Sequence, residues 1–107
     1  MGSIKDLVRK IDRKDLKNNV QKVLYSLLLS EGWLARTSFR LPNAAARIRD
    51  LRKEKYGGFI IDCVDSKGIK KYRRSRASKL TEKQTYYRID PKSITLDKVR
   101  KIFGKLI

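Results

Sequence analysis

The segment from residue 41 to residue 63 constrains the fold more than any other part of the chain. Its first part, LPNAAARIRDLRKEK, combines apolar residues at helical spacing with many arginines. It ends at Tyr56-Gly57-Gly58, and glycine is the residue that most readily adopts the backbone needed to end a helix. The following FIIDCV is β-branched and aromatic, as is typical of a strand. The sequence therefore predicts a basic helix over residues 42 to 55 that turns sharply into a strand over residues 59 to 64.

Three further segments have apolar residues at helical spacing. Residues 4 to 12 predict a short amphipathic helix, and the segment after Asp90-Pro91 predicts a final helix. The strongest pattern follows Asp15, which we expect to cap a helix that stops at Gly32. The apolar face of that helix predicts the centre of the core and consists of Leu16, Val20, Val23, Leu24, Leu27 and Leu28.

The remaining segments predict short strands. Trp33-Leu34 is consistent with a short strand and residues 35 to 39 with a single helical turn. TYYRI, residues 85 to 89, predicts a strand that pairs with residues 59 to 64 in a β-hairpin with a long basic loop. We expect Cys63 to pack as a small apolar residue in this hairpin.

Charge is the main guide to a partner. The chain has 28 Lys and Arg against 11 Asp and Glu, a formal net charge of +17 that costs self-repulsion unless an anionic partner neutralises it. Nucleic acid is the first candidate and an acidic membrane the second. No apolar run reaches the roughly 18 to 20 residues that span a bilayer, and there is no secretory signal pattern. We therefore expect a cytoplasmic protein with no membrane partner.

The chain has no histidine and one cysteine. Zinc fingers, Cys-His pairs and serine triads are therefore excluded. We expect no enzymatic activity, no catalytic residue, no metal site, no cofactor and no small-molecule substrate.

The order of the predicted elements is that of a winged helix-turn-helix, in which one helix enters the major groove of DNA and a hairpin lies along the neighbouring backbone. We predict an α+β fold with a three-helix core, a β-hairpin wing and short N-terminal and C-terminal helices. Residues 1 to 14 are expected to be a tag remnant and a short helical arm. Residues 15 to 90 are expected to form the winged-helix domain, and residues 91 to 107 a helix that packs on it.

NAAARIRDLRKEKYGG resembles a pattern, aaRI-x-[DE]-LR-x-x-G[YW], of helix-turn-helix domains in bacteriophage proteins and in DNA-binding domains attached to restriction endonucleases. The resemblance covers roughly residues 17 to 90, and TYYRI is similar to the closing strand of the family. It implies binding of double-stranded DNA by the target-recognition part of a phage regulator or restriction system. Some readers in restriction systems are thought to bind a modified base. The matched positions are Ala45, Ala46, Arg47, Ile48, Asp50, Leu51 and Arg52, with Tyr56, Gly57 and Gly58 in a permuted ending.

One side of the basic helix is expected to carry Ala44, Ala45, Ile48 and Leu51, and a helical wheel places the core side between Leu51, Ala44 and Ile48. Arg49 or Arg47 can make a bidentate contact to guanine. Asp50 can accept from cytosine or, as we favour, hold Arg47 or Lys53 in place. Asn43 can read adenine or cap the helix. Arg52, near the core side, is expected in a structural salt bridge. The outward and flanking positions are Ala46, Arg47, Arg49, Asp50 and Lys53.

Backbone phosphates are expected to meet two other sets of side chains. Arg36, Ser38 and Arg40 lie in the turn before the basic helix, where Trp33 either packs in the core or stacks on an exposed base. The loop of the hairpin supplies the second set, whose arginines are candidates for the minor groove. That set is Lys67, Lys70, Lys71, Arg73, Arg74, Arg76, Lys79 and Lys83.

Three alternatives remain open. A small basic protein that binds RNA or the ribosome has the same size and charge. A nuclease would use Asp62, Asp65 and Glu82, which lack a metal-binding spacing. The chain can also be a targeting module of a larger enzyme, with its terminal helices docking on that partner, docking on a second copy of the chain, or closing their own core.

Overall fold

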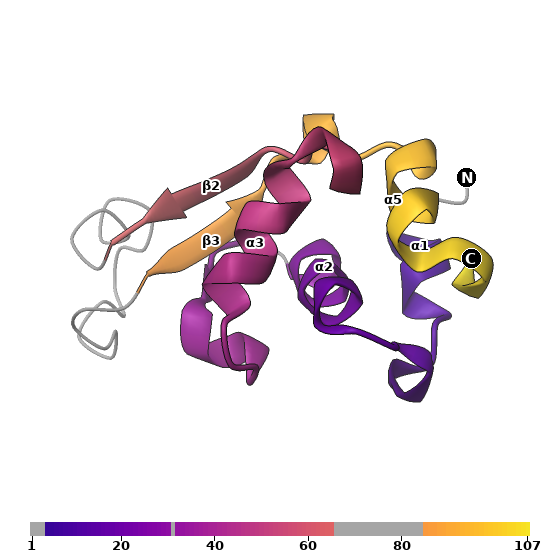
Figure 1. The fold of residues 1–107 in the computed structure, drawn as a ribbon, viewed down its shortest axis with the longest axis horizontal. Helices are drawn as coiled ribbons and strands as arrows, with labels where there is room; N and C mark the ends of the chain where they lie inside the picture. Colours follow the sequence, from indigo (N-terminus) through magenta and orange to yellow (C-terminus); the bar gives the residue numbers. More distant parts are fainter. Residues whose placement is uncertain (1–3, 31, 66–84) are drawn as a thin grey trace.

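The computed structural model describes residues 4–30, 32–65 and 85–107. These residues form an α+β fold with four α-helices and a three-stranded antiparallel sheet (Figure 1). No helix among them is long and apolar enough to cross a bilayer. In chain order the elements are α1 (Ile4–Arg9), α2 (Asn19–Leu29), β1 (Leu34–Ala35), α3 (Ala44–Arg52), β2 (Ile61–Val64), β3 (Tyr86–Ile89) and α5 (Leu96–Phe103).

The predicted long helix is α2, and it begins later than expected. The cap is Asn18, whose Oδ1 accepts from the backbone N–H of Gln21 at 2.9 Å. Asp15 instead belongs to a separate 3-10 turn, η1 (Arg13–Asp15), so the prediction of Asp15 as the cap was wrong. The helix ends at Leu29, with Ser30 rather than Gly32 at its C-terminal boundary.

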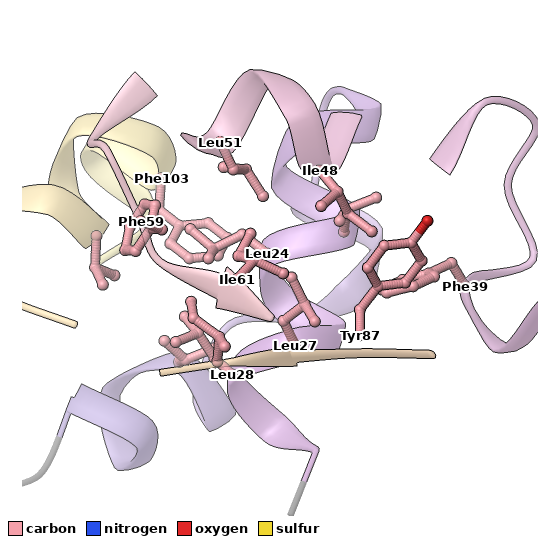
Figure 2. Packing of buried hydrophobic residues seen from close by; sticks show 14 of the residues in the cluster. Leu24, Leu27, Leu28, Phe39, Ile48, Leu51, Phe59, Ile61, Tyr87 and Phe103 are labelled. Atoms are coloured by element: carbon pink, nitrogen blue, oxygen red, sulfur yellow. The ribbon is translucent and has the colours of Figure 1, made fainter. Parts of the chain in front are cut away.

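α2 lies at the centre of the molecule, between α3 on one side and α1 and α5 on the other (Figure 1). Its side chains Val23 and Leu24 are fully buried, which confirms its predicted place in the core. Each such side chain contributes about 1.5 to 3 kcal/mol relative to an exposed one. Figure 2 shows Leu24, Leu27 and Leu28 packed among apolar residues of α3, β2, β3 and α5.

The terminal helices close this same core. Val8 of α1 and Val99 of α5 are fully buried in it, and Phe103 is nearly so. The side-chain amide of Gln21 also donates to the carbonyl of Ile102 at 3.0 Å, which ties α2 to α5. Of the alternatives for the two terminal segments, closure of their own core is the one observed.

The sheet has the order β1-β3-β2 and is antiparallel throughout. The predicted antiparallel pairing of β2 with β3 is confirmed, and the loop predicted between them lies outside the described residues. β1 pairs with the edge of β3 opposite to β2. A 3-10 turn, η2 (Arg36–Phe39), stands between α2 and α3 where a three-helix core would have its second helix. Cys63, predicted to be packed, is exposed because β2 runs on beyond the helices that cover the sheet (Figure 1).

The turn from α3 into β2 is tighter than the sequence indicates. α3 ends at Arg52, and a second 3-10 turn, η3 (Glu54–Tyr56), follows it, so the predicted helix over residues 42 to 55 was too long. Gly57 has φ +105°, and the N–H groups of Gly57 and Gly58 donate to the carbonyls of Glu54 and Lys53. This pairing is a Schellman motif, and it directs Phe59 into the core.

Tyr87 of β3 gives the fold a testable pH dependence. Its ring packs in the core 6.2 Å from that of Phe39, and burial, followed by the proximity of Cys63, raises the pKa of its hydroxyl above 10.0. A raised pKa in the folded state stabilises the fold below the unfolded pKa, and this contribution is lost as pH rises through the folded value. We expect the free energy of unfolding to fall above about pH 10 more steeply in the wild type than in Tyr87→Phe. Urea unfolding across that range measures it; parallel curves would contradict it.

Candidate nucleic-acid interface

α3 turns one face to the core and the other to solvent. Ala44, Ile48 and Leu51 are buried as predicted, whereas Ala45 is exposed, contrary to its predicted place on the core side. Arg49 and Lys53 are exposed, and Ala46, Arg47 and Asp50 are partly exposed at the flanks. Lys53 lies just past the last helical residue, at the C-terminal cap. The predicted outward face is therefore present, one turn shorter than expected.

Asp50 neutralises two of the cations on this face. Its Oδ2 lies 3.2 Å from the Nε of Arg47, and its Oδ1 lies 3.6 Å from the Nζ of Lys53. Both are i,i+3 ion pairs, and the Arg47 contact lacks hydrogen-bond geometry. The favoured interpretation of Asp50 is thus the one observed. Within the described part of the chain, Arg49 is the cation of the outward face that forms no ion pair.

Arg49 lines a surface hollow, the first hollow, which has a volume of about 430 Å³ and lies at the start of α3. Arg36, from η2, lines the same hollow, together with Asn43 and Ala46. Among residues 4–30, 32–65 and 85–107, no acidic residue lines it. Four of the predicted site residues thus meet in one place, although they come from the turn and from the helix.

Asn43 does not use its side chain as a helix cap. It precedes α3 with a left-handed backbone, φ +58° and ψ +31°, and its side chain makes no capping hydrogen bond. Its carbonyl instead accepts from the N–H groups of Ala46 and Arg47. Asn43 is exposed and lines the first hollow. It holds the N-cap position as one alternative predicted, but its side chain does not make the capping contact.

Arg52 has a structural role, though its partner differs from the one predicted. Its Nε and Nη2 both donate to the carbonyl of Ile61, at 3.2 Å and 2.6 Å. The contact ties the end of α3 to the start of β2, so the helix and the hairpin keep a set orientation. A salt bridge was expected; the carbonyl is the acceptor because β2 starts beside the last turn of α3.

The outer face of the sheet carries a small aromatic cluster. Trp33, only 9% exposed, packs with Tyr86, and the guanidinium of Arg88 lies 4.7 Å from the centre of its ring. Asp62 pairs with Arg88 across the hairpin, Nη2 to Oδ2 at 3.1 Å. Packing is thus the alternative observed for Trp33, which leaves little ring surface on which a base could stack.

Asp62 and Arg88 were not predicted as a pair, because their contact depends on a strand register that a long loop does not set. Asp62, one of the carboxylates considered for a nuclease, is engaged in this pair. The residues that the structure describes contain no cluster of three or more Cys, Asp or Glu that could hold a metal ion.

Ser38 and Arg40 are exposed on η2 and just after it. Arg40 has a left-handed backbone, φ +54°, and does not line the first hollow. The hairpin-loop set lies outside the described residues. It comprises Lys67, Lys70, Lys71, Arg73, Arg74, Arg76, Lys79 and Lys83.

Comparisons of the chain with protein-family models, with curated proteins and with solved structures gave no match.

Proposed function

We propose that this chain binds double-stranded DNA as a winged-helix module. In this proposal α3 enters the major groove, and the hairpin of β2 and β3 acts as the wing. The observation that carries it is the pair Arg36 and Arg49, which come from separate elements and line one hollow. None of the described residues that line this hollow is acidic.

The local charges support this assignment. Asp50 neutralises Arg47 and Lys53, whereas Arg49 and Arg36 form no ion pair among the described residues. An anionic partner would therefore find charge at Arg49 and Arg36 that no ion pair among the described residues compensates. The major groove is about 12 Å wide and admits a helix, and arginine pairs with the O6 and N7 of guanine.

The arrangement of elements also supports it. η2 holds the place of the helix that precedes the turn in a helix-turn-helix, residues 40–43 form the turn, and α3 follows as the recognition helix. The Arg52 contact to Ile61 couples α3 to the hairpin. Arg36 would then contact backbone phosphate and position the helix, while Arg49 reads a base. The module would supply recognition and no chemistry, either alone or as part of a larger enzyme.

The test is a competition between duplex DNA and structured RNA of equal length, followed by fluorescence anisotropy. We expect the duplex to be preferred, with a Kd of about 10⁻⁶ to 10⁻⁴ M for an arbitrary sequence at physiological salt. The logarithm of the affinity should fall with the logarithm of salt concentration by about 0.9 per phosphate contact. Preference for RNA would contradict the proposal and favour the RNA-binding alternative. If the duplex is preferred, selection from a pool of random duplexes, plain and methylated, would identify the target sequence.

A further inference from the structure

A second hollow, of about 360 Å³, lies beside the proposed DNA-binding surface. Four cationic side chains from three parts of the chain line it. Arg13 and Lys14 come from η1 and Lys22 from α2, and Arg40 is the residue just after η2. Phe39 and Leu41 supply apolar lining, and Ser26 adds a hydroxyl.

The positive charge of this hollow is uncompensated. In the part of the chain that the structure describes, no acidic residue lines it, and none of its four cations forms an ion pair. Asp12 and Asp15 are near in sequence, but the side chain of Asp12 accepts from the backbone N–H of Lys14 at 3.0 Å, and neither residue lines the hollow. Bringing four like charges together in this way costs free energy unless an anion binds between them.

The second hollow adjoins the first. Leu41 lines both hollows, Arg36 and Arg49 line the first, and Arg40 lines the second. In Figure 1 three segments that supply lining residues, η2, the start of α2 and η1, lie along the lower edge of the ribbon. A single anionic strand that follows this edge would meet cations in both hollows.

We propose that the second hollow binds phosphates of the DNA backbone next to the stretch that α3 reads. This inference rests on the proposed function and extends it to Arg13, Lys14 and Lys22. Phosphodiester groups suit the site because lysines and arginines from different elements can each neutralise one phosphate. Such contacts do not recognise a base. The contact would add affinity without adding sequence preference.

The test compares two double variants that remove the same charge. Arg13→Gln/Lys22→Gln alters the hollow, and Arg100→Gln/Lys105→Gln alters exposed cations on and after α5, outside both hollows. Affinity for a duplex of about 20 base pairs is measured over a range of salt concentrations. We expect the salt dependence to become shallower by about 0.9 per lost contact in the first variant and to change little in the second. Arg13→Lys/Lys22→Arg, which keeps the charges, should restore the original slope.

Equal changes in the two double variants would overturn the inference, since they would reflect net charge alone. The inference would also be overturned if Arg13→Lys/Lys22→Arg were folded, as judged by circular dichroism, but did not show the original dependence of affinity on salt concentration. The proposed function fails separately, if the unaltered chain does not prefer duplex DNA. A chain that binds duplex DNA and loses selectivity in Arg49→Ala, but treats the two double variants alike, would refute this inference only.

Discussion

Replacing Arg49 by alanine is expected to lower the preference for the selected duplex over an unrelated one by about 5- to 150-fold. That range corresponds to the roughly 1 to 3 kcal/mol that a bidentate contact between arginine and guanine contributes to discrimination. The physical reason is that Arg49 is exposed on the outward face of α3 and is not held by Asp50, which already pairs with Arg47 and Lys53. Titration of both duplexes at one salt concentration measures the change.

Three further variants separate recognition of bases by Arg49 from general attraction to DNA. Lys53→Ala removes a charge near the same helix end, but Asp50 already neutralises that charge, so the preference should change little. Arg36→Ala, and Arg74→Ala in the hairpin loop, should weaken binding to all sequences alike, as expected for phosphate contacts. If Arg49→Ala also weakened all sequences alike, α3 would not be reading bases through this residue.

Replacing Gly57 by alanine is expected to destabilise the fold by about 2 to 5 kcal/mol. The left-handed backbone costs an L-residue about 1 to 2 kcal/mol, and overpacking adds about 1 to 3 kcal/mol. Gly57 has φ +105°, and a Cβ there would lie 2.8 Å from the Cε2 of Phe59. Phe59 is buried and has little room to move. Urea unfolding followed by circular dichroism gives the free energy of unfolding.

Gly58→Ala is the matched control for this turn. Gly58 is also left-handed, at φ +62°, but the nearest atom to its added Cβ would be the Cα of Glu54, at an ordinary 3.7 Å. We expect a loss of only about 1 to 2 kcal/mol there. Equal losses in the two variants would mean that the contact with Phe59 adds nothing, and unchanged stability of Gly57→Ala would contradict the prediction outright.

Local chemistry in the sequence was enough to predict the elements and much of the core. The apolar face of α2 and the buried side of α3 follow from helical spacing, because a helix that buries one stripe must repeat it every three or four residues. The Asp50 pairs with Arg47 and Lys53 follow from the same spacing. The glycine pair after Tyr56 predicted the turn into β2, since few other residues adopt a left-handed backbone.

Element boundaries were predicted less well, because neighbouring residues compete for them. Asn18 rather than Asp15 caps α2, since the chain first forms the turn η1. α3 stops at Arg52 because the Schellman motif takes up the next residues. The third strand was missed as a partner of the hairpin, because the pairing of β1 with β3 joins segments far apart in sequence.

The sequence by itself determined the strong positive charge, the helix that forms the core and the abrupt change from basic helix to strand. Each depends on spacing, composition or backbone preference within a few residues. Only the tertiary structure decided which cations share a surface. Arg36 meets Arg49, and Arg13 and Lys22 meet Arg40, because η1, α2, η2 and α3 pack around one core. Strand register likewise decided that Arg88 contacts both the ring of Trp33 and the carboxylate of Asp62. Such contacts join residues that no local pattern relates, so packing alone sets them.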